Sequence, residues 1–208
     1  MCIRDSTSGL LLTNLCLSQN LEQPIEISQS TTGYNTLKHA DLDNDGDEDL
    51  IVSSSDNELV SWYPNLGGGN FGDQVIITHE YAMDITYVHP GDFDGDGNID
   101  VVFCGEDLGV KWSQNLGGGN FGPSQTITYL VNNTLAVHVA DINDDGNLDV
   151  LSASSSDDKI AWYQNNGTGS FSSQPYITTS ANGASDVFAA DLDNDGDLDV
   201  LSTAKYDD

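Results

Sequence analysis

Basic side chains are scarce in this sequence. Five lysines and arginines stand against 34 aspartates and glutamates, so the formal net charge is −29. Nucleic acids and anionic membrane surfaces are bound by basic patches, and a chain this acidic is a poor partner for either. The charge is also concentrated. Four windows of nine residues hold six, four, four and five acids, and these windows are 41–49, 92–100, 141–149 and 191–199.

Cysteine is scarce as well. Cys2 and Cys16 lie near the start of the chain, which leaves Cys104 alone in the rest of the sequence. A single cysteine cannot form an internal disulfide. Stability must therefore come from packing and from whatever fills the acidic windows.

Long apolar runs are missing too, and we find no segment that could span a membrane. The apolar run at residues 9–19 is too short for a transmembrane helix and has about the length of a signal-peptide core. Thr13 and Asn14 interrupt it. We interpret residues 1–22 as a signal-peptide-like or disordered leader and residues 23–208 as the folded region.

What the chain does contain is a tandem repeat. The acidic windows begin at residues 41, 92, 141 and 191, which are 51, 49 and 50 residues apart. Trp62, Trp112 and Trp162 follow at intervals of 50 residues. A glycine turn comes after each tryptophan, with the sequences NLGGGNFG (65–72), NLGGGNFG (115–122) and NNGTGSFS (165–172). Repetition at this period indicates an array of similar structural units.

Each unit holds four short segments that are rich in Val, Ile, Thr, Tyr or Trp and bounded by Gly, Asn or Asp, which predicts strands. In the third unit these segments are 135–139, 149–155, 159–165 and 175–179. No run has a helical period. Four antiparallel strands in about 50 residues describe one propeller blade. We therefore expect an all-β chain that forms part of a β-propeller of four-stranded antiparallel blades. A stacked β-solenoid is the alternative, but its units are usually shorter.

The acidic windows have the pattern of a cation-binding loop. Oxygen-bearing side chains stand at positions 1, 3, 5, 7 and 9, and glycine stands at position 6, where a loop that wraps an ion must bend. Ca²⁺ takes about 6–8 oxygen ligands, and position 7 is expected to give its backbone carbonyl. We predict about one Ca²⁺ per loop, four in this chain. The predicted metal-binding residues are Asp41, Asp43, Asp45, Asp47, Asp49, Asp92, Asp94, Asp96, Asn98, Asp100, Asp141, Asn143, Asp145, Asn147, Asp149, Asp191, Asp193, Asp195, Asp197 and Asp199.

An EF-hand, a zinc or copper site and a plain acidic turn fit the windows less well. An EF-hand needs a bidentate glutamate at position 12, where this chain has Val52, Phe103, Ser152 and Ser202, and a helix should follow. The scarcity of nearby His and Cys counts against zinc and copper. Acidic Asp–Gly turns made for solubility are a further alternative. The pattern occurs in four windows at the same place in each repeat, which favours a cation-binding loop over a plain acidic turn.

The loop D-x-D-x-D-G-x-x-D and the turn N-x-G-x-G-x-F-G together resemble the FG-GAP/VCBS repeat family. Such repeats build the β-propeller of integrin α-subunits and of many secreted bacterial proteins. The resemblance covers roughly residues 23–208. It implies a seven-bladed propeller with Ca²⁺ in the loop between the first and second strands of a blade. Phe71–Gly72, Phe121–Gly122 and Phe171 match the family's FG, whereas Ser172 departs from it.

Histidine, tryptophan and the GGGN sequences give weaker signals. His39, His89 and His138 stand two or three residues before their windows, and Phe188 stands nearby in the fourth unit, so packing or channel lining is a better interpretation than a ligand. The tryptophans could stack on sugars, but their regular place in the third strand favours a core between blades. The GGGN sequences do not continue as a phosphate-binding loop. No catalytic set stands apart from the repeat.

The resemblance implies a function in binding. We expect a secreted or cell-surface calcium-binding module that acts as a protein- or glycan-binding adhesion scaffold, and no enzyme activity. The alternative is the propeller domain of a secreted polysaccharide-active enzyme.

The sequence also predicts an open arc of roughly four blades. Residues 24–28 align with the fourth strands, but no earlier strand precedes them, and residues 201–208 align with 151–158, before any further tryptophan strand. We expect the remaining blades to be missing from this chain. Exposed end faces should make it poorly soluble or oligomeric.

Overall fold

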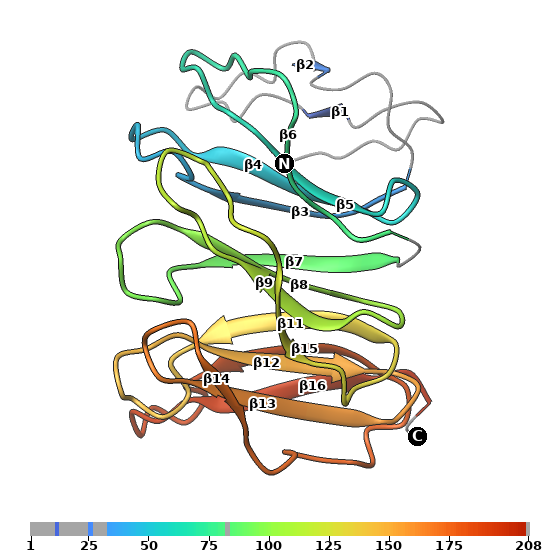
Figure 1. The fold of residues 1–208 in the computed structure, drawn as a ribbon. Coiled ribbons are helices and arrows are strands. Elements are labelled where there is room, and N and C mark those ends of the chain that lie inside the picture. Colours follow the sequence, from blue (N-terminus) through green and yellow to red (C-terminus); the bar gives the residue numbers. More distant parts are fainter. Residues whose placement is uncertain (1–10, 13–24, 27–32, 82–83, 207–208) are drawn as a thin grey trace.

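The computed structural model describes residues 11–12, 25–26, 33–81 and 84–206, and every regular element in these ranges is a β-strand. Three antiparallel sheets of four strands and one of two strands lie one after another along the chain (Figure 1). We call them blades 1 to 4. Blade 1 contains β3 (Tyr34–Ala40), β4 (Asp49–Ser54), β5 (Leu59–Tyr63) and β6 (Val75–His79). Blade 2 contains β7 (Ile85–Gly91), β8 (Asp100–Gly105), β9 (Gly109–Ser113) and β10 (Gln125–Thr128).

The later blades follow the same plan. Blade 3 contains β11 (Thr134–Ala140), β12 (Asp149–Ser154), β13 (Lys159–Asn165) and β14 (Phe171–Ser173). Blade 4 contains β15 (Ala184–Ala190) and β16 (Asp199–Ala204). In every sheet the strands are neighbours in sequence order, and the sheets do not close on one another. The all-β fold, the four-stranded antiparallel blades and the open arc are confirmed. No described segment forms a helix with the length and hydropathy that a membrane crossing needs.

The first strands β3, β7, β11 and β15 lie side by side through the stack (Figure 1). Side-chain hydroxyls link them. Thr36 Oγ1 donates to the Thr86 carbonyl at 3.0 Å, and Thr86 Oγ1 donates to the Thr134 carbonyl at 2.6 Å. The register shifts at the start of the first strand in all four blades. The repeat in the sequence is thus also a repeat in local backbone geometry.

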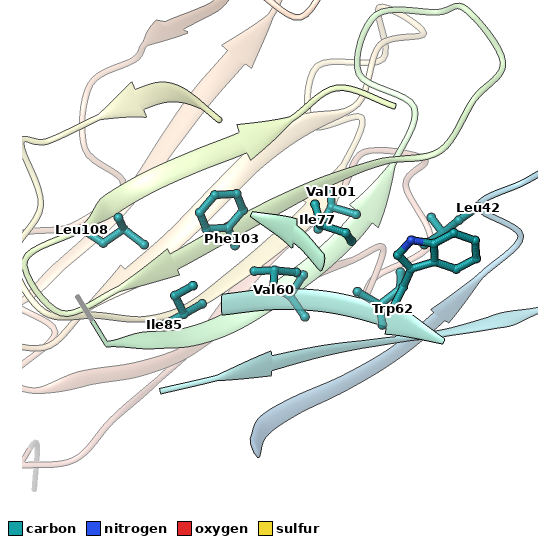
Figure 2. Close-up of a cluster of buried hydrophobic side chains, with 10 residues drawn as sticks. Leu42, Val60, Trp62, Ile77, Ile85, Val101, Phe103 and Leu108 are labelled. Carbon is teal, nitrogen blue, oxygen red and sulfur yellow. The ribbon is translucent and has the colours of Figure 1, made fainter. Parts of the chain in front are cut away.

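Blades 2 and 3 lie inside the stack and bury both faces against their neighbours. The second strands β8 and β12 are buried at every residue, because a sheet inside the stack is covered on two sides. Figure 2 shows the core between blades 1 and 2, where Trp62 lies beside Leu42 and belongs to one cluster with Val101 and Phe103 of blade 2. A second core between blades 2 and 3 includes Trp112. The predicted place of these tryptophans between blades is confirmed.

Two segments differ from expectation. Residues 175–179 were expected to form a full fourth strand, but β14 ends at Ser173 and only Thr178 makes a bridge, to Ile160. Pro175 has no N–H to give to a ladder, which shortens the pairing. Near the start of the chain, β1 (Leu11–Leu12) pairs with β2 (Ile25–Glu26). The rest of the predicted leader, residues 1–22, lies outside the described residues.

Candidate metal loops

Each acidic window forms the loop between the first and second strands of its blade, as the resemblance implied. The glycine turn between the third and fourth strands lies at the same end of the sheet, because neighbouring strands run antiparallel. The acidic loop and the glycine turn are therefore in contact. Asn65 N–H donates to Asp49 Oδ1 at 2.8 Å across this junction.

The first aspartate holds the loop in its bent form. In blade 1, Asp41 accepts the N–H of Gly46 at 2.9 Å and the N–H of Asp45 at 3.2 Å. The glycine at position 6 donates to the first aspartate in every loop. Its φ lies between 86° and 100° in all four loops, in the region that favours glycine. The glycine at the bend is thus a conformational requirement.

Three loops bring carboxylate oxygens within 4.8 Å of one another. Two oxygens that bind one Ca²⁺ at about 2.4 Å can be at most about 4.8 Å apart, so these groups fit the ion. The groups are Asp41, Asp43 and Asp45; Asp92, Asp94 and Asp96; and Asp191, Asp193 and Asp199. The structure therefore brings together the predicted residues at positions 1, 3 and 5 in the first two loops, and those at 1, 3 and 9 in the fourth.

The third loop replaces charge with an amide. Asn143 Nδ2 donates to Asp145 Oδ2 at 2.9 Å, and Asn143 Oδ1 accepts the Asp145 N–H at 3.3 Å. The Asn143 amide holds the pKa of Asp145 below its usual value. Hydrogen bonds within this loop therefore stabilise the charged form of Asp145.

At position 7 the backbone and side chain turn toward position 5. Asp47 N–H donates to Asp45 Oδ1 at 2.9 Å, and the three later loops repeat this contact. The amides of Asn98 and Asn147 also donate to the aspartate at position 5. The side chains of Asp47 and Asp197 do not join the close carboxylate groups of the described loops.

The ninth aspartate is bound to backbone in a way that sequence reasoning missed. Asp49, Asp100 and Asp149 are fully buried. Each accepts one N–H from position 2 of its loop and one from the glycine turn. Burial raises the pKa of Asp100 to about 7, and burial also raises the pKa values of Asp49 and Asp149. In blade 4, Asp199 is exposed, and among the described residues it accepts a hydrogen bond from the Leu192 N–H alone, at 3.0 Å.

The asparagine that begins each glycine turn was also missed. Asn65, Asn115 and Asn165 are 50 residues apart, and each donates a side-chain N–H to the carbonyl at position 8 of its own loop. The fixed 50-residue spacing of this asparagine could have indicated its role. It was overlooked because the neighbouring glycines already explained the turn.

His89 and His138 are packing residues, whereas His39 was compared with them one position out of step. The strand register places Lys38, His89, His138 and Phe188 at equivalent positions. The rings of His89 and His138 meet edge to face at 5.5 Å, and His138 lies 4.4 Å from Phe188. Burial lowers the pKa of His89 to about 4. His39 instead pairs with Glu48 at the surface.

A cleft lies at the opposite end of the blades, between blades 2 and 3. It has a volume of about 390 Å³ and is lined by Asp107, Tyr129, Leu130, Val131, Asn132 and Asp157. Tyr129 is 63% exposed, and its hydroxyl accepts a hydrogen bond from Thr126 Oγ1 at 2.8 Å. Lys159 Nζ lies 2.8 Å from Asp157 and donates to the Leu130 carbonyl at 3.1 Å. The cleft therefore combines a held aromatic ring with carboxylate and amide groups.

Comparison with solved structures finds the same fold in a lectin. An Agrocybe aegerita lectin, described by its specific recognition of non-reducing terminal N-acetylglucosamine, superposes with a TM-score of 0.67 at 19% sequence identity. The alignment covers 94% of this chain and 55% of the lectin chain. At this identity the likeness shows the fold alone. A search of curated proteins found no match.

The repeats also match a described family. The profile of the FG-GAP-like repeat matches three overlapping segments, residues 41–103, 92–152 and 141–202. Each segment runs from one acidic loop into the second strand of the following blade. The matches together cover most of the chain and confirm the resemblance drawn from the loop and the glycine turn. The chain belongs to the FG-GAP-like repeat family.

Proposed function

We propose that this chain is a calcium-binding module of a secreted or cell-surface protein, and that it acts as a binding scaffold with no catalytic role. The observation that carries the proposal is the convergence of carboxylate oxygens within 4.8 Å in loops built alike. Like charges about 5 Å apart repel by roughly 3 kcal/mol at an effective dielectric constant of about 20. A cation at the centre of each loop attracts every carboxylate and so offsets their mutual repulsion.

The donor set suits Ca²⁺. Every candidate ligand is an oxygen, and Ca²⁺ accepts several carboxylates in flexible geometry, whereas Mg²⁺ demands a smaller octahedron. Bound Ca²⁺ would neutralise the carboxylates and fix the loop, with positions 1, 3 and 5 as its side-chain ligands. Extracellular modules bind Ca²⁺ with dissociation constants of about 10⁻⁴–10⁻³ M, which is compatible with loops as exposed as these.

Chelation tests the calcium site. At a free concentration ten times Kd, each site adds about 1.4 kcal/mol, so four sites add roughly 6 kcal/mol. We expect a chelator to lower the melting temperature markedly, millimolar Ca²⁺ to restore it, and equal Mg²⁺ to restore much less. A melting curve that does not change in chelator contradicts the proposal.

A glycan is the ligand class that we favour for the scaffold. The lectin of the same fold recognises N-acetylglucosamine, and the cleft between blades 2 and 3 presents groups that suit a sugar. The ring of Tyr129 offers a stacking face, while the carboxylates and the Asn132 amide can bond hydroxyl groups. Lys159 offsets the charge of Asp157, and Asp107 leaves the cleft net negative, so neutral or amino sugars fit better than acidic ones.

A glycan array in the presence of Ca²⁺ separates a scaffold from an enzyme. Binding without turnover supports the scaffold, and release of shortened polysaccharide supports the enzyme alternative. Tyr129→Ala should remove binding if the cleft is the site. Tyr81→Ala is the matched control, because Tyr81 is also exposed, in the connection between blades 1 and 2.

A further inference from the structure

A side-chain amide joins the metal loops of blades 1 and 2. Asn115 Nδ2 donates to the Leu42 carbonyl at 2.7 Å, and Leu42 is position 2 of the blade 1 loop. The same nitrogen donates to the Ile99 carbonyl at 3.0 Å, in the loop of blade 2. Asn115 is fully buried. One asparagine therefore holds two loops that belong to neighbouring blades.

Blades 2 and 3 repeat the arrangement. Asn165 Nδ2 donates to the Phe93 carbonyl at 2.8 Å and to the Leu148 carbonyl at 3.0 Å. Phe93 is position 2 of the blade 2 loop, and its carbonyl also accepts the Gly169 N–H at 2.9 Å. Asn165 is 1% exposed. The contact is a regular feature of the stack.

These contacts continue through the buried ninth aspartates. Leu42 N–H donates to Asp49 Oδ2 at 2.8 Å, and Asn115 N–H donates to Asp100 Oδ1 at 2.7 Å. Phe93 N–H donates to Asp100 Oδ2 at 2.9 Å. A connected series of bonds and peptide units thus runs through three loops, in the order Asp49, Leu42, Asn115, Asp100, Phe93, Asn165 and Asp149.

An amide is the side chain that this position requires. Its two N–H groups serve two carbonyls, and Asn115 Oδ1 accepts the Gly117 N–H at 3.0 Å. Alanine would remove both donors from a buried site, which leaves the Leu42 and Ile99 carbonyls short of a partner. Aspartate would set a negative charge against the same two carbonyls.

We propose that Asn115 and Asn165 are positioning residues that couple cation binding in consecutive loops. Each of these loops reaches its full affinity when the asparagine of the following blade is bonded to its position 2 carbonyl. An ion that orders the loop also orders that carbonyl, so docking of the next blade and ion binding favour each other reciprocally. This inference rests on the proposed calcium binding.

Asn65 provides the matched control. Its Nδ2 donates to the Glu48 carbonyl at 2.9 Å in its own loop. Among the residues that the structure describes, it donates to no carbonyl of another blade. Asn65→Ala therefore removes the contact within a blade, whereas Asn115→Ala removes that contact and the one between blades.

Hydrogen exchange of the full chain across a calcium titration tests the coupling. Asn115→Ala should raise the calcium midpoint for protection of residues 41–49, in the preceding blade, by about fivefold or more. Asn165→Ala should do the same for residues 92–100. Asn65→Ala removes only a contact within blade 1, so it should shift the midpoint for residues 92–100 less than Asn115→Ala shifts the midpoint for residues 41–49. A wild-type midpoint for residues 41–49 in Asn115→Ala overturns the coupling.

A second variant keeps the test open if Asn115→Ala fails to fold. Asp43 bonds within its own loop, where its Oδ1 accepts the Asp45 N–H at 3.3 Å. Asp43→Asn should weaken the blade 1 site and also raise the midpoint for residues 92–100, with residues 191–199 unchanged. An unchanged midpoint for residues 92–100 contradicts the coupling. Wild-type protection that does not depend on calcium overturns the proposed calcium site itself, which is a distinct result.

Discussion

Asp199 and its three counterparts show how the surroundings of one side chain decide what it can do. Asp49, Asp100 and Asp149 have their carboxylates closed in by two backbone N–H groups each. Asp199 has one such bond, and its oxygens lie with those of Asp191 and Asp193. The difference comes from the glycine turn, which supplies the second N–H in blades 1 to 3. The ninth position therefore links the loop to the turn wherever a turn is present.

The fourth loop is suited to a test of single ligands. Asp191→Ala or Asp195→Ala should abolish one cation site and leave the others, because no described blade follows to carry the effect further. We expect titration calorimetry to show the loss of about one ion in four. The Asp191 carboxylate also bends the loop by accepting the Gly196 N–H at 3.2 Å, so this variant should have the larger effect. Loss of all binding from one substitution contradicts separate loops.

His89 predicts a dependence of stability on pH. Burial holds its pKa at about 4, below the value of about 6.5 in an unfolded chain. As pH falls through 6.5, the unfolded state binds the proton first, so the stability that is complete above pH 6.5 is lost progressively down to pH 4. Between pH 7 and pH 5 this amounts to about 2 kcal/mol.

His89→Phe should reduce that loss, because Phe188 shows that the repeat accepts phenylalanine at this position. Urea unfolding of both proteins in chelator at pH 7 and pH 5 measures the difference. Some dependence should remain, since burial also lowers the pKa of His138. Equal losses of stability in the two proteins contradict the prediction.

The glycine turn packs against the blade before it. An added Cβ at Gly119 would overlap the ring of Trp62 in blade 1, and Gly169 has the same relation to Trp112. At Gly118, next to Gly119, an added Cβ would meet nothing closer than 3.6 Å, although the φ of 61° is left-handed. The turn thus contains one glycine required by backbone conformation and another required by both conformation and packing.

This difference can be measured with two alanine variants. Gly118→Ala should cost about 1–2 kcal/mol, the penalty of a left-handed residue with a Cβ. Gly119→Ala adds the overlap with the Trp62 ring, which costs roughly a further 1–3 kcal/mol. Urea unfolding at saturating Ca²⁺ gives both values. Equal losses of unfolding free energy in the two variants would show that the turn does not pack against the preceding blade.

The strands and the acidic loops could be predicted because their determinants are local. Strand-favouring composition, turn residues and the 50-residue period specify each blade, and Gly46 marks the bend of its loop. The Asn115 to Leu42 bond could not be predicted, because it joins residues 73 positions apart and depends on how two sheets stack. The equivalence of Lys38 with His89 was missed for a different reason. Both stand three residues before their windows, but the comparison followed residue type and took His39 instead.

The exposed apolar face of blade 4 bears on whether the whole chain associates in solution. Phe188, Leu192 and Leu201 are exposed there. Their counterparts inside the stack are covered; Leu42 and Phe93, which correspond to Leu192, are fully buried. Apolar surface of this kind favours association. We expect sedimentation velocity to show that the 208-residue chain associates as its concentration rises.

A paired substitution tests this expectation. Leu192→Lys with Leu201→Lys should shift the chain toward monomer, because the lysines place charge on the associating face. Leu66→Lys, on the exposed glycine turn of blade 1, should leave association unchanged. A monodisperse wild-type monomer at all concentrations contradicts the prediction.

The contact from Asn115 back to Leu42 joins residues that are synthesised at different times. During synthesis, a loop emerges from the ribosome before the asparagine that will bond to it. Translation at about 5–20 residues per second delivers the next blade, about 50 residues, in roughly 3–10 s. Each loop therefore waits one blade before it is secured, and cation loading should trail the growing chain by one repeat. The blade 1 loop is thus secured before the blade 2 loop.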